Sequence, residues 1–338
     1  MRTRIGSRAA VVTLCVALIV SVAAHADEAT APGIGCSIFA VQVGDTVLFG
    51  NNVDDGNPNT YYSVFPAQGN GEYGYITLGF NQAQGGLNEA GLAFDTNAVQ
   101  ARELASQPDL PQHSGGPIGI ILEMLRNAAT VDEALAIAER YHWGDRLTNQ
   151  WLIADAQGQA VVISAGRSGE LAITRKPTGD GYLTSTNINR SRSLPVFACW
   201  RFRTITRMLR GIVARGSVTV EDAAAVLDAA HQEGVFLREG VLLNTVYSNI
   251  YDLKTREITV YYWYQFDSPI TLRLDEELAG GSRRLRVRDL FPSQVVERAA
   301  SENERLLGLT EQGRTRIRKP LGLVLAATLL VGLILMWR

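Results

Sequence analysis

The chain has 338 residues, a formal net charge of -2 and 46% hydrophobic residues. This near-average composition is typical of a globular protein with one large domain or two small ones. Because the chain has no global excess of positive charge, we do not expect nucleic acid among its partners.

Residues 1–26 have the pattern of a secretory signal peptide. Three arginines precede an apolar run over residues 9–24, and Ala24-His25-Ala26 is a small-x-small cleavage signal. We therefore predict an exported protein whose signal peptide covers residues 1–26. The Ala/Pro/Gly segment 27–35 is interpreted as a propeptide, with a flexible tail as the alternative.

Residues 35–54 contain the chemistry that we expect the rest of the domain to support. Cys36 opens two apolar, strand-like segments, residues 37–43 and 46–49, which a Gly-Asp pair separates. A two-residue turn folds such segments antiparallel. The polar stretch 51–54, expected to be a loop, then returns toward Cys36.

Cleavage between Gly35 and Cys36 would give one residue both a thiol and a free α-amino group. The amine, with an ordinary pKa of roughly 7.7–8.0, can accept the proton of a thiol whose ordinary pKa is roughly 8.5. Nucleophile and base then need no second residue. A carboxylate such as Asp54 would hold the amine in position.

Three other interpretations of Cys36 stay open. The first is a small buried hydrophobe at the start of a strand. The second is a disulfide with Cys199, because these are the two cysteines that follow the signal peptide and an oxidising compartment favours their pairing. The third is a lipid on Cys36, for which Ile34-Gly35-Cys36 is a partial match.

The domain, expected over residues 36–295, alternates blocks of strands with pairs of helices. Further strands are predicted over residues 75–80, 92–94, 151–155, 160–164, 170–175, 182–186, 244–252 and 257–266. Helices are predicted over residues 117–128, 130–141, 197–214, 220–233 and 293–307. The polar residues 101–116 and four aromatics are placed in loops, where Tyr61, Tyr62, Phe65 and Tyr75 could form an acyl pocket. Residues 276–319 are expected to lack strands, and segregated blocks of this kind indicate an α+β layered domain.

The C-terminal residues 320–337 are predicted to be a transmembrane helix. Their unbroken apolar run follows a basic cluster and is near the short limit of about 17 residues for a membrane span. Residues 296–319 are interpreted as a charged juxtamembrane helix and linker. The predicted localisation is therefore a membrane-anchored protein with its domain outside the cytoplasm. That orientation is against the positive-inside bias, and trimming of the tail is the alternative.

Five short motifs, in this order over residues 36–266, resemble N-terminal-nucleophile (Ntn) amide hydrolases of the choloylglycine hydrolase and penicillin V acylase type. The motifs are Gly35-Cys36, Gly50-Asn51-Asn52-Val53-Asp54, Gly86-Leu87-Asn88-Glu89-Ala90-Gly91-Leu92, Thr186-Asn187 and Trp200-Arg201-Phe202-Arg203. The resemblance, which extends to related linear-amide hydrolases and acyltransferases, implies an αββα sandwich, often a tetramer. It also implies hydrolysis of a non-peptide C–N bond in an N-acyl compound.

The resemblance assigns roles to five residues. Cys36 is the nucleophile and base, Asp54 orients its amine, and Arg201 favours the thiolate. Asn187 and Asn97 donate to the oxyanion, although Asp95 is close enough to make the second match ambiguous. Without the resemblance, such asparagines are interpreted as turn formers and the arginine as part of a solvated helix face.

Two departures from the family pattern concern this site. The resemblance implies an arginine where this chain has Asn51 or Asn52. The contact that such an arginine makes with the substrate or the thiolate is therefore missing here or supplied by another residue. Cys199 lies two residues from Arg201, so a possible disulfide partner lies near the proposed nucleophile.

The predicted function is hydrolysis of a small-molecule N-acyl amide through an acyl-thioester on Cys36, after autoproteolytic removal of residues 1–35. No cofactor and no metal are expected, and a homo-oligomer is the family's implication. Two alternatives stay open, an N-acyltransferase with the same site and an inactive membrane-attached binding or scaffold protein. In the scaffold alternative the basic segments 283–288 and 314–319 would contact anionic headgroups or a partner.

Overall fold

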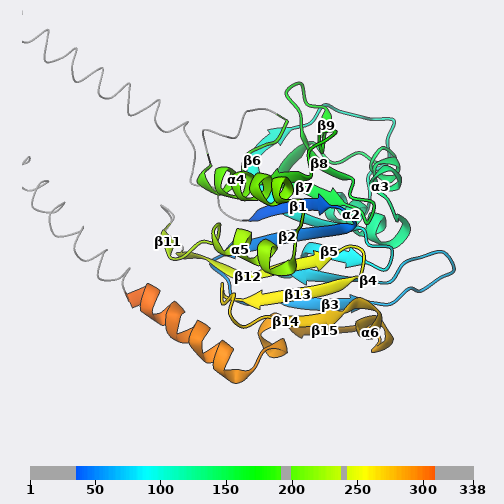
Figure 1. Ribbon diagram of the computed structural model, residues 1–338. Coiled ribbons are helices and arrows are strands. Elements are labelled where there is room, and N and C mark those ends of the chain that lie inside the picture. The colour runs from blue at the N-terminus through cyan, green and yellow to red at the C-terminus, as the bar shows by residue number, and fades with distance from the viewer. Residues whose placement is uncertain (1–35, 192–198, 237–241, 309–338) are drawn as a thin grey trace, which may run out of the picture. The chain divides into compact units, whose positions relative to one another are not determined.

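The computed structural model describes residues 36–191, 199–236 and 242–308 (Figure 1). The predicted signal peptide, propeptide and transmembrane helix lie outside these ranges. Within the three ranges, no helix is both long enough and apolar enough to span a membrane. The helix expected over residues 293–307 is confirmed as a helix over residues 293–308.

Among the described residues, the strands form two large antiparallel sheets. The first sheet has the order β10 (Tyr182–Ser185), β1 (Ser37–Val43), β2 (Thr46–Asp55), β12 (Leu242–Asp252), β13 (Glu257–Tyr262) and β14 (Ile270–Arg273), and β11 (Val235–Phe236) also pairs with β12. The second sheet has the order β15 (Arg283–Arg286), β3 (Tyr61–Phe65), β4 (Tyr75–Gly79), β5 (Ala83–Asn88), β6 (Ala93–Glu103), β7 (Arg146–Ala154), β8 (Ala160–Ala165) and β9 (Leu171–Arg175).

The largest core cluster lies between the two sheets, where alternate residues of each strand point inward. Helices α4 (Trp200–Arg215) and α5 (Val220–Asp228) pack on the outer face of the first sheet. Helices α2 (Gly116–Asn127) and α3 (Val131–Ala138) pack on the outer face of the second sheet. The predicted α+β layered domain is therefore confirmed as a mixed fold, in which two large sheets are covered by pairs of helices (Figure 1).

The prediction that residues 51–54 form a loop was wrong. These residues continue β2 as far as Asp55, because β2 lies between β1 and β12 and its backbone groups pair on both edges. The predicted return to the cysteine is confirmed, since Ser37 lies opposite Asn52 in the register. Polar residues are therefore placed within a fully buried strand beside Cys36.

The loop assignment of the four aromatics was also wrong. Tyr61, Tyr62 and Phe65 belong to β3 and Tyr75 to β4, in keeping with the strand preference of aromatic residues. Tyr62 is fully buried between the sheets. Strand β6 reaches Glu103 into the expected loop, and the region expected to lack strands contains the edge strand β15, which pairs with β3.

Candidate active site

Cys36 lies immediately before β1 and is 6% exposed, with its side chain in the core between the two sheets. Cys199 is the residue that precedes α4 and is partly exposed. Both cysteines are free thiols, so the structure does not contain the alternative disulfide. Cys36 is thus a buried thiol at the end of the central hairpin.

Asn97 holds the backbone of Cys36. Its amide nitrogen donates to the Cys36 carbonyl oxygen at 2.8 Å, and its amide oxygen accepts from the Ser185 hydroxyl at 2.5 Å. The Gln150 amide in turn donates to Ser185 at 3.0 Å, and Gln150 lies opposite Asn97 in the β6–β7 ladder. Because the backbone carbonyl of Cys36 can only accept, the Asn97 amide can have only one orientation, with its nitrogen toward Cys36. Asn97 therefore hydrogen-bonds to the backbone of the proposed nucleophile.

Asp54, Arg201 and Asn187 form a second set of contacts. One guanidinium nitrogen of Arg201 lies 2.6 Å from Asp54 Oδ2, and the other donates to Asn187 Oδ1 at 2.5 Å. Arg201 is only 3% exposed, so the alternative of a solvated helix face does not hold for it, whereas Arg203 is exposed. The Asn187 amide nitrogen donates to the Ala98 carbonyl at 2.7 Å, one residue after Asn97.

The electrostatic environment keeps the Cys36 thiol neutral in the uncut chain. Burial is the main cause of its raised pKa, and the carboxylates of Asp95 and Asp54 act in the same direction. A hydrogen bond from the Asp54 backbone and the Arg201 cation act in the opposite direction. Burial also raises the pKa of Asp54 to about 6, against the influence of Arg201 and Thr245. A liberated ammonium group at Cys36 would add the positive charge that favours a thiolate.

Asp95 is a further buried carboxyl between the sheets. It accepts a hydrogen bond from the Asn51 amide at 2.6 Å and one from the Thr96 backbone at 2.7 Å. Gly85 lies opposite Asp95 and leaves room for the carboxyl, since a Cβ there would be 2.1 Å from Asp95 Oδ2. Asn52 instead points to the helix layer, where its amide donates to the Leu227 carbonyl at 2.8 Å. Of the two asparagines at the departure from the family pattern, Asn51 is thus the one that faces between the sheets.

Asp95→Asn is expected to change how stability depends on pH. Burial raises the pKa of Asp95 well above its ordinary value, so this group stabilises the fold fully below about pH 4 and loses that contribution as pH rises. The unfolding free energy of the wild type should therefore fall relative to Asp95→Asn by up to about 1.4 kcal/mol per pH unit above pH 4. Denaturant unfolding between pH 5 and pH 8 measures this slope. The exposed Asp45→Asn is the control, and parallel curves for wild type and Asp95→Asn would contradict the prediction.

The five predicted site residues are brought together from the start of β1, from β2 and β6, from the segment after β10 and from α4. Hydrogen bonds link Cys36 to Asn97, and Arg201 to both Asp54 and Asn187. The sequence did not identify three further members of these networks, Thr245, Ser185 and Gln150, and it named Asp95 only as an alternative to Asn97. In the described ranges no group of three His, Cys, Asp or Glu residues could hold a metal ion.

Comparisons with known proteins place the chain in a family. The family model described as acyl-coenzyme A:6-aminopenicillanic acid acyl-transferase matches residues 41–234, which is more than half of the chain. No curated protein matches the sequence.

Two kinds of solved structure share the fold. Penicillin V acylase from Agrobacterium tumefaciens is 17% identical with a TM-score of 0.56, and the match covers 72% of this chain and 88% of that one. A variant of conjugated bile acid hydrolase from Clostridium perfringens is 14% identical with a TM-score of 0.58, and the match covers 74% and 96% of the two chains. A second mutant of that hydrolase, 13% identical with a TM-score of 0.56, has the same coverage.

The chain therefore has the fold of penicillin V acylase and conjugated bile acid hydrolase, as the resemblance implied. The family model describes enzymes, in keeping with the prediction that this chain is an enzyme. The chain belongs to the acyl-coenzyme A:6-aminopenicillanic acid acyl-transferase family.

Proposed function

We propose that this chain is a cysteine Ntn amidohydrolase with an αββα sandwich that cleaves a linear N-acyl amide through an acyl-thioester on Cys36. The observation that supports it best is the continuity of the site. The buried thiol, the Asn97 amide on its backbone and the Asp54–Arg201–Asn187 set meet at one end of the two sheets. The site becomes competent after removal of residues 1–35, which gives Cys36 its α-amine.

In the proposed reaction the Cys36 α-amine accepts the thiol proton, and the sulfur attacks the carbonyl carbon of the substrate. Asparagine amides are suited to stabilise the oxyanion because they donate without adding a titratable charge. Asn187 is the proposed donor, with its oxygen fixed by Arg201 and its nitrogen therefore turned the other way. The ammonium then gives its proton to the leaving amine as the C–N bond breaks, and water hydrolyses the thioester to a carboxylic acid.

The rate is expected to fall in acid because the proposed site needs Asp54 ionised to hold the Cys36 amine. Burial raises the pKa of Asp54 to about 6 in the uncut chain and the ammonium of processed Cys36 opposes this rise, so protonation of Asp54 adds a break to the acid limb of kcat/KM at or below this pH. The α-amine of Cys36 has to be neutral to accept the thiol proton, so its own titration adds a separate break at higher pH. A pH–rate profile between pH 5 and pH 9 measures both breaks, and a profile with no break below pH 7 would contradict the role of Asp54.

A panel of N-acyl compounds tests the activity directly. It includes penicillin V, conjugated bile acids, acyl-homoserine lactones and N-acyl amino acids, and it is scored for equal release of acid and amine. Purified protein whose mass begins at Cys36 and which releases both products supports the proposal. A chain that begins at Asp27 and is inert on every compound supports the scaffold alternative.

The family model favours one second candidate, an N-acyltransferase that uses the same thioester. The two activities differ in whether water or a second amine attacks the thioester. Adding an amine acceptor to the hydrolysis assay separates them, because a transferase forms a new amide at the expense of free acid.

Export and a membrane attachment through residues 320–337 complete the proposal. They are supported by the sequence pattern of the two ends. Fractionation of cells that express the full chain tests them, and recovery of the protein in the cytosol would contradict both.

A further inference from the structure

Asp54 has a second buried hydrogen-bond partner besides Arg201. The hydroxyl of Thr245, on β12, lies 2.5 Å from Asp54 Oδ1, while Arg201 contacts Asp54 Oδ2. Thr245 is fully buried. The two oxygens of the carboxyl therefore have separate partners from separate elements, which leaves the carboxyl one orientation.

The direction of the Thr245 proton is fixed by Gln232. The backbone N–H of Gln232 donates to the Thr245 hydroxyl oxygen at 2.8 Å, and the Thr245 N–H donates back to the Gln232 carbonyl at 2.9 Å. A backbone N–H can only donate, so the hydroxyl accepts there. Its single proton is then directed to Asp54.

A β-bulge places Thr245 at this position. In the β12–β2 ladder Thr245 lies opposite Asp54, but Tyr247 lies opposite Val53, so one residue of β12 is extra. Bulges of this kind are frequent next to active sites, where they redirect a side chain. Without the extra residue, the strand alternation would turn the following side chains to the opposite faces.

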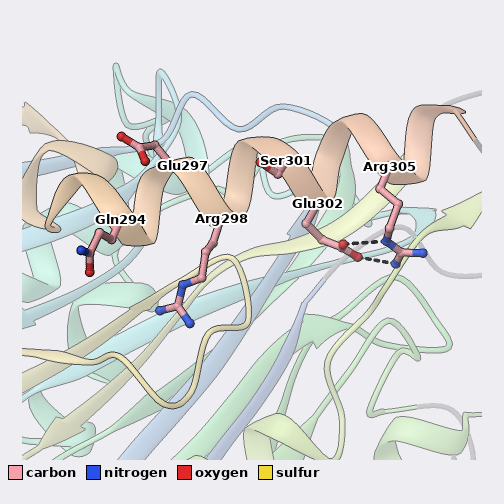
Figure 2. A pocket seen from close by; sticks show the side chains of 6 residues that line it. All are labelled: Gln294, Glu297, Arg298, Ser301, Glu302 and Arg305. Carbon is pink, nitrogen blue, oxygen red and sulfur yellow. Dashed lines mark hydrogen bonds and ion pairs between the residues drawn. The ribbon is translucent and has the colours of Figure 1, made fainter.

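The segment that contains Gln232 is itself held on two sides. The Gly234 N–H donates to the Asn244 side chain at 2.8 Å, next to Thr245 on β12. From the other side, Arg305 of the helix 293–308 lies 2.9 Å from Glu233, and Figure 2 shows Arg305 also paired with Glu302. The segment with the donor to Thr245 is therefore linked both to β12 and to the helix 293–308.

We propose that Thr245 is a positioning residue that orients Asp54 toward the Cys36 amine during amide cleavage. This inference rests on the proposed function, in which Asp54 holds that amine. The charged and titratable groups that face Asp54 are Arg201 from α4, His231 after α5 and Cys36 itself. The hydroxyl acts on Asp54 through orientation and through a hydrogen bond that favours the ionised carboxyl.

The test compares Thr245→Val, which keeps the shape, with Thr245→Ser, which keeps the hydroxyl. We expect Thr245→Val to lose roughly tenfold in kcat/KM at pH 6 and less at pH 8, because the pKa of Asp54 rises when the donor is lost. The lower break of the acid limb should move to higher pH by about one unit, and Thr245→Ser should restore it. Thr184→Val is the control, since the buried Thr184 hydroxyl has no hydrogen-bond partner among the described residues.

Mass and thermal unfolding identify the processed, folded fraction of each variant before the assay. If Thr245→Val does not fold, Thr245→Ala replaces it, because alanine places no methyl against the carboxylate. Two results would overturn the inference. One is an acid limb that does not change in Thr245→Val or Thr245→Ala. The other is a loss of kcat/KM that is equal at every pH and that Thr245→Ser does not restore. Failure of the proposed function would be seen separately, as a wild-type chain that does not begin at Cys36 or does not cleave amides.

Discussion

Cys36→Ser is expected to abolish both amide cleavage and maturation. A serine hydroxyl keeps the size of the thiol, but its much higher pKa leaves the α-amine unable to generate the nucleophile near neutral pH. We expect activity to fall by more than about a thousandfold and residues 27–35 to stay attached. Intact mass after purification and the release of amine from the best N-acyl compound are the two measurements.

Cys199→Ser is the matched control for this experiment. Cys199 is the second free thiol of the described residues and is partly exposed before α4. The processed chain of Cys199→Ser should begin at Cys36 and keep full activity. An active Cys36→Ser chain, or wild-type protein that works only when Cys36 and Cys199 are joined as cystine, would disprove the thioester mechanism.

Local patterns were sufficient to predict most of the helices and the central strands. The capping box at Thr130 marks the start of α3, and the apolar runs of β8 and β12 are long enough to be recognised without tertiary context. Strands β3, β5, β14 and β15 were missed because they are short, glycine-containing or charged. Their strand conformation depends on neighbours in the sheet, such as the pairing of β15 with β3.

The site residues could be predicted where they belong to short motifs whose order along the chain matches the family. The resemblance named five residues from their motifs, and the structure brings all five together. Thr245 gave no such indication, because a single threonine in an apolar strand is ordinary strand composition. The bulge that turns it toward Asp54 is a property of the β12–β2 pairing and has no local sequence pattern. Ser185 and Gln150 were missed for the same reason, since their roles depend on contacts with Asn97 across strands.

The end of the central hairpin shows why the polar stretch was misassigned. Asn51, Asn52 and Asp54 are fully or almost fully buried, and each has a specific partner from a different element. Burying polar residues in a strand costs free energy unless they are hydrogen-bonded. Their presence beside Cys36 therefore indicates a functional site, and not the loop that the sequence predicted.

Arg201→Met is expected to have the largest effect on stability. Removing one partner of a buried ion pair leaves the other charge uncompensated, which costs about 3–5 kcal/mol. Arg201 and Asp54 are both buried and lie 2.6 Å apart, and Arg201 lowers the pKa of Asp54 against the effect of burial. Without the guanidinium the pKa of Asp54 rises above 6. A larger fraction of Asp54 is then protonated at neutral pH, and amide cleavage should fall as well.

The pH dependence separates this mechanism from a simple packing defect. Asp54 is protonated in both proteins near pH 5, but near pH 8 the wild type has an ionised, paired carboxyl while the variant has to keep a proton that the unfolded chain has released. The stability deficit of Arg201→Met should therefore be larger at pH 8 than at pH 5 in denaturant unfolding. Adding Asp54→Asn to Arg201→Met should recover part of the loss at pH 8, because asparagine is neutral without having to keep a proton. The exposed Arg203→Met, two residues along the same helix, should match the wild type. A deficit in Arg201→Met that does not change with pH, or that Asp54→Asn deepens, would show that Arg201 stabilises the fold by packing alone.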